Sequence, residues 1–299
     1  MKVAVTGGMG FLGQYVVESI KKQNYIPLIL SRKPDSSSNV ELRPTDYSKD
    51  DLVKNLFDVD AIVHLAAKRG SQGKISEFHD NEILTQNLYE ACFELGIHNI
   101  VYASTISVYS NDNKIPWTEE NIPSPTLMYG ISKLTNEYIG NIYSNKKGLR
   151  VKNLRLAHLY GFNEKNNYMI NRFFRQAFHQ EKLTLHAKSV AKREFLYAKD
   201  AAKAIICALN RSNTFGTFNI GSGEALTNYE VAVEINKAFK NVNNLVVKDS
   251  NADEGIYSSL MDSSLAREVF SFSPDYTFSK AVSEIYTFMR GLDDVPLWY

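Results

Sequence analysis

The apolar residues in the first half of the chain follow two alternating patterns. Short, nearly continuous apolar runs are typical of strands buried on both faces, and between them apolar positions recur every three or four residues, as in amphipathic helices. We expect strands at residues 3–6, 26–30, 40–42, 61–65, 99–103 and 151–156. We expect helices at residues 11–23, 51–57, 77–95 and 127–144. This alternation predicts an α/β fold, a doubly wound parallel sheet with helices on both faces.

The alternation becomes less regular after residue 160. Helices are expected at residues 169–180, 198–209, 229–239 and 279–290, and short strands at residues 183–185 and 217–220. We therefore expect residues 1–160 to form the main domain. Residues 161–299 should form mostly a smaller C-terminal lobe, with some segments returning to the first domain.

Composition and charge exclude several classes of function. The net charge of +1 gives no bulk attraction to nucleic acid or to an anionic membrane. The two cysteines, Cys92 and Cys207, form no disulfide framework, and no metal site is expected. The first residues resemble no signal peptide, and no run reaches the roughly 18 apolar residues that a membrane span needs. We expect a cytoplasmic protein.

A glycine-rich turn follows the first expected strand and opens the first expected helix. Gly7, Gly10 and Gly13 fit G-x-x-G-x-x-G, and Gly8 also allows G-x-G-x-x-G. Such glycines permit a tight turn and a close approach of the backbone to a pyrophosphate, which the N–H groups of the helix then bind. The context predicts a Rossmann domain that binds a dinucleotide. The expected contacts are Gly7, Gly10, Phe11, Leu12 and Gly13.

The end of the second expected strand bears on the choice between NAD and NADP. An NAD site places a carboxylate here to bind the ribose 2′-hydroxyl, whereas this chain has Ser31-Arg32-Lys33, and Asp35 comes only after a proline. A hydroxyl and two cations suit a 2′-phosphate, although both cations can equally be solvated turn residues. We predict that Ser31 and Arg32 contact the cofactor, with NADP(H) preferred and NAD(H) possible.

Candidate catalytic groups lie on one helix and one strand end. Tyr129 and Lys133 are four residues apart, which places them on the same helical face one turn apart. A nearby ammonium favours the phenolate and lowers the pKa of the tyrosine. Thr105 ends the preceding strand at the carboxyl edge, where ligands bind in such folds. We predict that Thr105 holds a substrate oxygen and that Tyr129 exchanges its proton.

These motifs, in this order, resemble the extended short-chain dehydrogenases of the sugar epimerase/dehydratase group. The resemblance covers nearly the whole chain. Its quoted stretches are Thr6–Gly13, Asp46-Tyr47, His64-Leu65-Ala66-Ala67, Thr105–Tyr109, Tyr129–Lys133, Leu154–Gly161, Arg193–Asp200 and Phe218–Gly223.

The resemblance implies specific roles for these residues. It implies that Asp46 and Tyr47 contact the adenine, that the backbone of Leu65, Ala66 and Ala67 lines the cofactor, and that Lys133 also contacts the nicotinamide ribose. Arg193 would bind the diphosphate of a nucleotide-sugar, and the alternative is a surface ion-pair residue. Residues 161–299 would be mostly the substrate lobe, and homodimers would form through the helices at residues 77–95 and 127–144.

Three positions depart from the family pattern. His158 stands where relatives have an asparagine that contacts the substrate, so it is either a substrate contact or a polar packing residue. Phe162 replaces a usual proline, and Ala252-Asp253-Glu254-Gly255 replaces a turn that carries a second phosphate-binding arginine. These departures keep a non-nucleotide ketone open as a substrate.

The residues after Thr105 narrow the reaction. Family dehydratases carry two acids there, and epimerase-reductases of the GDP-fucose type carry a cysteine, whereas this chain has Ile106 and Ser107. We therefore predict an NADPH-dependent reductase of a nucleotide-linked 4-keto-6-deoxy sugar, with Tyr129 as the proton donor, of the kind used in polysaccharide biosynthesis. The alternative is an NAD(P)-dependent nucleotide-sugar 4-epimerase, and a non-catalytic NADP-sensing protein is the second alternative.

Overall fold

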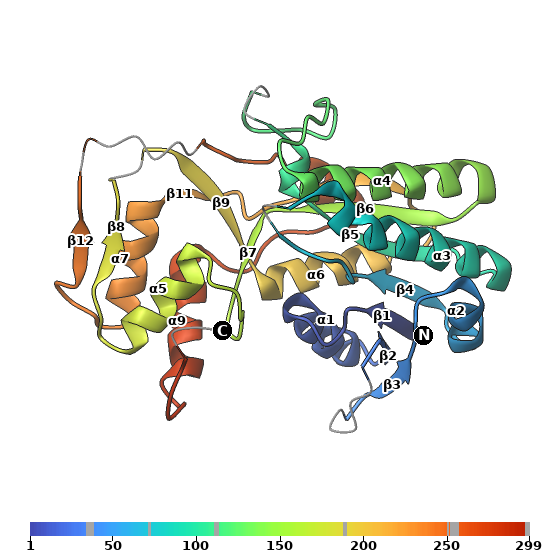
Figure 1. The fold of residues 1–299 in the computed structure, drawn as a ribbon, viewed down its shortest axis with the longest axis horizontal. Coiled ribbons are helices and arrows are strands. Elements are labelled where there is room, and N and C mark those ends of the chain that lie inside the picture. Colours follow the sequence, from blue (N-terminus) through green and yellow to red (C-terminus); the bar gives the residue numbers. More distant parts are fainter. Residues whose placement is uncertain are drawn as a thin grey trace.

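The computed structural model describes residues 1–33, 39–70, 73–110, 114–187, 190–249, 251 and 257–296. Its centre is a seven-stranded parallel sheet in the order β10-β6-β5-β4-β1-β2-β3 (Figure 1). The strands are β1 (Lys2–Thr6), β2 (Ile26–Ser31), β3 (Glu41–Pro44), β4 (Ala61–His64), β5 (Asn99–Thr105), β6 (Arg150–Leu156) and β10 (Gly216–Ile220). This order confirms the predicted doubly wound fold, and it reverses between β1 and β4, the point at which such sheets bind ligands.

Helices cover both faces of this sheet because successive strand residues point to opposite sides. On one face Val3 and Val5 pack in a core with α1 (Phe11–Lys22) and α6 (Ala198–Leu209). On the other face Ala4 packs in a core with α2 (Lys49–Leu56) and α3 (His79–Leu95), to which α4 (Met128–Lys147) adds.

The second lobe lies beside the carboxyl edge of the main sheet (Figure 1). It contains a three-stranded sheet in the order β11-β9-β7 and a two-stranded sheet of β12 and β8. The strands are β7 (His158–Tyr160), β8 (Leu183–Leu185), β9 (Lys192–Tyr197), β11 (Ala225–Thr227) and β12 (Leu245–Val247). An aromatic-rich core joins them to α5 (Met169–Phe178), α7 (Asn228–Ala238) and α9 (Phe278–Met289).

Some segments after residue 160 pack with the main sheet. The helix α6 lies against α1, β10 adds the edge strand beside β6, and α8 (Ser264–Phe270) covers β10. Phe218 on β10 and Phe270 on α8 pack with ring centroids 4.3 Å apart. The chain therefore crosses between the two parts several times, and the β6–β7 and β9–α6 junctions flank the space between them.

The structure changes several expected boundaries. The strand expected at residues 40–42 is β3 at Glu41–Pro44, and α2 begins at Lys49 because Ser48 accepts the N–H of Asp51 as an N-cap. The helix expected at residues 77–95 is a 3₁₀ turn, η1 (Ile75–Glu77), followed by α3. The pattern also missed five elements that are short or begin with charged residues: β7, β9, β11, β12 and α8.

Candidate active site

The glycine turn packs too closely for side chains. Gly7 has a positive φ of 71°, and a Cβ there would lie 2.8 Å from the backbone nitrogen of Ala66. A Cβ at Gly13 would overlap the carbonyl oxygens of Gly7 and Gly8. Gly10 is the N-cap of α1, and among the described residues the first turn of this helix carries no acidic side chain. The turn therefore presents backbone N–H groups to an anion, as the pyrophosphate of a dinucleotide requires.

Two adjoining cavities run from this turn along the carboxyl edge of the sheet. One has a volume of about 540 Å³ and the other of about 640 Å³, and Gly7, Ala66 and Ala67 line both. Phe11, Leu12 and Leu65 line the first cavity as well. Together the cavities give a nicotinamide dinucleotide an extended site whose centre is the glycine turn.

The second cavity ends at the residues predicted to select the cofactor. Ser31, Arg32 and Lys33 line it, and Ser31 Oγ accepts the N–H of Lys33 at 3.2 Å. Tyr47 also lines it, with its hydroxyl donating to Leu30 O at 2.9 Å. Asp35 lies outside the described residues.

Asp46 is the one predicted cofactor residue that lines neither cavity within the described part of the chain. Its carboxylate accepts the N–H of Ser48 at 2.7 Å, so it is held by the turn that begins α2. An Asp before a helix commonly satisfies backbone groups in this way. At this point of the chain, the residue that lines the second cavity is its neighbour Tyr47.

The three predicted catalytic residues meet in the first cavity. Thr105, Tyr129 and Lys133 all line it, on β5 and the first two turns of α4. Thr105 Oγ1 accepts the N–H of Ser107 at 3.2 Å, which leaves its O–H to donate to a ligand. Lys133 Nζ donates to Ala103 O at 2.7 Å and lies 5.8 Å from the Tyr129 ring centroid.

Close packing fixes α4 against the sheet. A Cβ at Gly130 would overlap Ser107 O, so a glycine beside Tyr129 lets the helix approach the turn after β5. One turn beyond Lys133, the buried Glu137 pairs with Arg155 on β6, with Nη2 and Oε2 2.7 Å apart. These contacts hold the first turns of α4 against the end of β5 and against β6.

The electrostatics differ from the expectation that Lys133 lowers the pKa of Tyr129. Burial of the phenol raises the pKa of Tyr129 to about 12, and the cation that opposes this rise is Arg69. Burial also lowers the pKa of Lys133 to about 7, with Arg69 acting in the same direction. The Lys133 side chain is enclosed and held by a carbonyl, so it is a weaker source of positive charge than its sequence position suggests.

His158 and Arg193 line the same cavity on the neighbouring strands β7 and β9. Burial lowers the pKa of His158 to about 4, and Arg193 acts in the same direction, so the imidazole is neutral at neutral pH. Arg193 Nη2 donates to Asn228 Oδ1 at 2.7 Å. Arg193 is therefore positioned inside the cavity and is not a solvated surface residue. The segment predicted to lack a second arginine, Ala252–Gly255, lies outside the described residues.

Glu194, beside Arg193, holds two loops near the cavity. Its carboxylate accepts the N–H of Gly223 at 2.8 Å and that of Met261 at 2.9 Å, and its side chain is buried. Buried carboxylates need such donors, so Glu194 serves the architecture while Arg193 faces the cavity.

Sequence reasoning missed an ion pair in the first cavity. Arg69, in the β4–α3 loop, and Glu164, in the β7–α5 loop, both line it, with Nη2 and Oε1 3.3 Å apart. Arg69 follows β4 at the same carboxyl edge as the glycine turn, which is the one signal that could have indicated it. Nothing local in the sequence pairs it with Glu164, which is 95 residues away.

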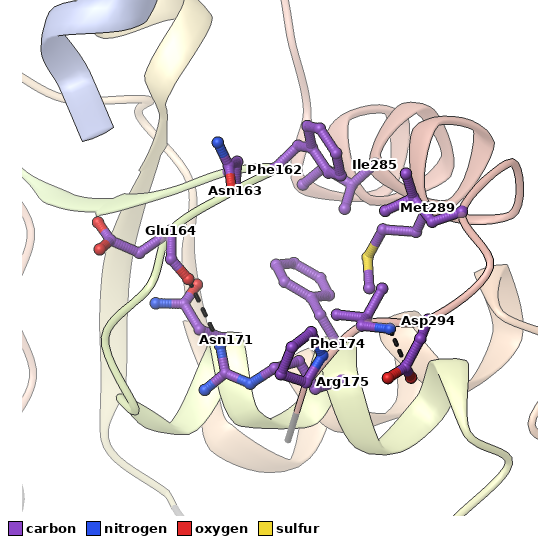
Figure 2. A pocket seen from close by; sticks show the side chains of 13 residues that line it. Phe162, Asn163, Glu164, Asn171, Phe174, Arg175, Ile285, Met289 and Asp294 are labelled. Atoms are coloured by element: carbon purple, nitrogen blue, oxygen red, sulfur yellow. Dashed lines mark hydrogen bonds between the residues drawn. The ribbon is translucent and has the colours of Figure 1, made fainter. Parts of the chain in front are cut away.

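Glu164 also borders a smaller cavity of about 70 Å³, which Figure 2 shows between α5 and α9. Phe174 from α5 faces Ile285 and Met289 from α9 across it, whereas the Arg175 side chain extends toward Glu164 (Figure 2). The Arg175 guanidinium donates to the backbone oxygen of Glu164 at 3.4 Å. None of the predicted catalytic residues lines this cavity.

The predicted catalytic residues and the glycine turn share one cavity, which identifies the class: an enzyme of the short-chain dehydrogenase type with a Rossmann fold. The profile of the NAD dependent epimerase/dehydratase family matches residues 3–221, and the chain belongs to this family. Across the described residues, no helix combines the length and apolar character that crossing a membrane requires.

Two relatives match the chain over its full length. The crystal structure of a UDP-N-acetylglucosamine 4-epimerase from Bacillus cereus is 67% identical, covers 100% of both chains and superposes with a TM-score of 0.94. An uncharacterised UDP-glucose epimerase of Bacillus subtilis (strain 168) is 30% identical, covering 98% of this chain and 99% of that protein.

A more distant solved structure shares the fold alone. The UDP-glucuronic acid 4-epimerase from Bacillus cereus, in complex with UDP-glucuronic acid and NAD, is 24% identical. It covers 97% of this chain and 99% of its own, with a TM-score of 0.85.

Proposed function

We propose that the enzyme is a 4-epimerase of a UDP-N-acetylhexosamine. The observation that carries this proposal is that Thr105, Tyr129 and Lys133 line one cavity with the glycine turn. Ile106 and Ser107 provide no acid for water elimination beside Thr105. The similarity to a UDP-N-acetylglucosamine 4-epimerase supports the epimerase alternative over the reductase that the sequence favoured.

In this proposal the residues act on one carbinol oxygen of the hexose. Thr105 donates a hydrogen bond to the C4 oxygen, and Tyr129 takes the proton from it and later returns it. Lys133 holds the cofactor ribose. A bound nicotinamide dinucleotide supplies the hydride acceptor and donor for C4.

Residues 1–160 would hold the cofactor, and residues 161–299 mostly the substrate. Arg193 would bind the diphosphate, where a charge-assisted contact anchors the part of the substrate that does not react. The neutral imidazole of His158, next to it, would add a hydrogen bond.

Incubation with UDP-N-acetylglucosamine and either oxidised cofactor tests the proposal. We expect the 4-epimer to form, measured by chromatography or NMR, without net change in nicotinamide absorbance. Reduced cofactor consumed in stoichiometric amounts with a nucleotide-linked 4-keto-6-deoxy sugar would support the reductase. Cofactor binding without any turnover would support the second alternative, a non-catalytic NADP-sensing protein.

The reductase stays the second candidate because of the Ser31-Arg32-Lys33 turn. This turn lines the second cavity. Among the described residues that line this cavity, the carboxylate is that of Asp80 on α3, and no carboxylate comes from the turn after β2. We therefore propose a preference for NADP(H) over NAD(H).

Arg32→Ala should weaken NADPH binding by about 1.5–3 kcal/mol and leave NADH binding nearly unchanged. Lys22→Ala, at the exposed end of α1, is the matched control. Equal loss for both cofactors would contradict the preference.

We also propose a homodimer formed through α3 and α4. These helices pack side by side and expose Ile83, Phe93 and Ile142. Exposed apolar side chains grouped on adjacent helices are typical of subunit interfaces. Sedimentation should show a dimer for the wild type and a monomer for Ile142→Asp. A monomeric wild type would contradict the proposal.

A further inference from the structure

Two charged residues from different parts of the fold meet in the wall of the first cavity. Arg69 comes from the loop after β4 in the main domain, and Glu164 from the loop after β7 in the second lobe. The guanidinium Nη2 and the carboxylate Oε1 are 3.3 Å apart. The pair thus lies in the wall of the cavity that Thr105 and Tyr129 also line.

The two partners differ in exposure. The Glu164 side chain is 3% exposed, whereas that of Arg69 is 50% exposed. A buried carboxylate is costly unless it is paired, and besides Arg69 the Oε1 of Glu164 accepts the N–H of Asn166 at 3.3 Å. Although burial opposes the charged form of Arg69, the Glu164 charge raises the pKa of its guanidinium. Glu164 therefore neutralises Arg69 where Arg69 meets the cavity.

The position of the pair relates it to the hexose ring. In the proposed function the C4 oxygen lies at Tyr129, and Tyr129 lines the same cavity as Arg69 and Glu164. C5 is a ring neighbour of C4 and carries C6, so the C6 substituent would lie close to the C4 oxygen, inside the same cavity. An arginine alone at this point would bind a C6 carboxylate, because a guanidinium pairs with carboxylates in a bidentate geometry.

Resting on the proposed function, we propose that the Arg69–Glu164 pair selects a neutral hexose against a hexuronate. Glu164 occupies the guanidinium that a C6 carboxylate would need, and its own charge repels that carboxylate. Such built-in repulsion is a general means of discrimination between similar ligands. The other cationic side chains lining the cavity within the described residues are Lys133, held by Ala103 O, and Arg193, held by Asn228.

The test compares the affinities for two probes by calorimetry with the cofactor-loaded enzyme. The probes are UDP-N-acetylglucosamine and its C6-oxidised form, UDP-N-acetylglucosaminuronic acid. We expect the wild type to bind the neutral sugar more tightly by about tenfold or more, since like charges at close range cost at least this much. Glu164→Gln should shift the affinity ratio toward the uronate by about tenfold or more, because it frees Arg69.

Arg69→Gln removes the positive charge of the pair instead of the negative one. It should disturb folding less than Glu164→Gln, because the Arg69 side chain is half-exposed. It should shift the ratio further toward the neutral sugar, because Glu164 then meets the ligand unpaired. Glu268→Gln on α8 removes the same charge from an exposed site and should leave the ratio unchanged. Unchanged ratios in both cavity variants would overturn the proposal.

The outcomes separate this proposal from the proposed function. Ratios that shift as expected in an enzyme that forms no 4-epimer would overturn the function and support the selectivity. A 4-epimer formed with unshifted affinity ratios would support the function and overturn the selectivity. A wild type that binds neither probe would overturn both.

Discussion

Two buried lysines, one on α4 beside the carboxyl edge of the main sheet and one within β6, occupy different surroundings. Burial lowers the pKa of each to about 7. Lys133 lies at the carboxyl edge, lines the first cavity and donates to Ala103 O. Lys152, near the start of β6, donates to Asn99 Oδ1 at 2.7 Å and lines none of the cavities described above. A perturbed pKa alone therefore does not identify a functional residue, and the sheet edge supplies the missing information.

Tyr129→Phe gives the largest expected effect at the carboxyl edge. Losing the hydroxyl removes proton transfer, so turnover should fall by about 10²–10⁴-fold while cofactor affinity stays nearly intact. Steady-state rates and a cofactor titration measure the two quantities. Tyr138→Phe, exposed on the same helix, is the control and should behave like the wild type. A Tyr129→Phe enzyme with a near-normal rate would show that another group is the acid.

The two lysines can be compared directly with the same substitution. Lys133→Met should reduce turnover and weaken cofactor binding together, by about 10-fold or more each, because it removes the hydrogen-bond donor proposed to hold the cofactor ribose. Lys152→Met should leave kcat and cofactor affinity near those of the wild type, because that side chain bonds within the fold. If both variants lost activity equally while remaining folded, the contrast between the two positions would be wrong.

Gly130→Ala tests how closely α4 must approach the sheet. Because the added Cβ would overlap Ser107 O, we expect the first turn of α4 to shift and the free energy of unfolding to fall by about 1–3 kcal/mol. The shift should move Tyr129 away from Thr105, so kcat should fall more than KM rises. Gly291→Ala is the control, since its Cβ would meet nothing closer than 3.9 Å. Normal kcat in Gly130→Ala would indicate that the contact is not needed.

The cofactor half of the site was more accessible to sequence reasoning than the substrate half. The turn at Gly7–Gly13 is local, and its backbone does the binding, so seven consecutive residues carry the signal. Thr105, Tyr129 and Lys133 could be predicted to lie together because parallel strands bring their carboxyl ends to one edge, and all three line one cavity; their catalytic roles stay a prediction. The Arg69–Glu164 pair joins two loops that are distant in sequence. The strand before Glu164, β7, has only three residues. The sequence left reduction and epimerisation both open and favoured reduction, because both reactions would use the same three side chains, and the similarity to a UDP-N-acetylglucosamine 4-epimerase supports the alternative.

The smallest expected effect is a change in the pH dependence of stability at Lys152. Its pKa is about 7 in the folded protein, because burial and then Arg150 lower it, against 10.5 as its ordinary value. Between these values the unfolded chain binds the proton and the folded protein does not, so this group makes stability rise with pH. The slope contributed by one proton is at most about 1.4 kcal/mol per pH unit. Urea unfolding at pH 7.0, 7.5, 8.0 and 8.5, compared between wild type and Lys152→Met, isolates this contribution from that of Lys133. We expect the wild type to gain more stability across the series than the variant. Identical slopes would mean that Lys152 stays protonated in the fold, held by Asn99 and by Arg211 O, and that its burial does not displace the proton.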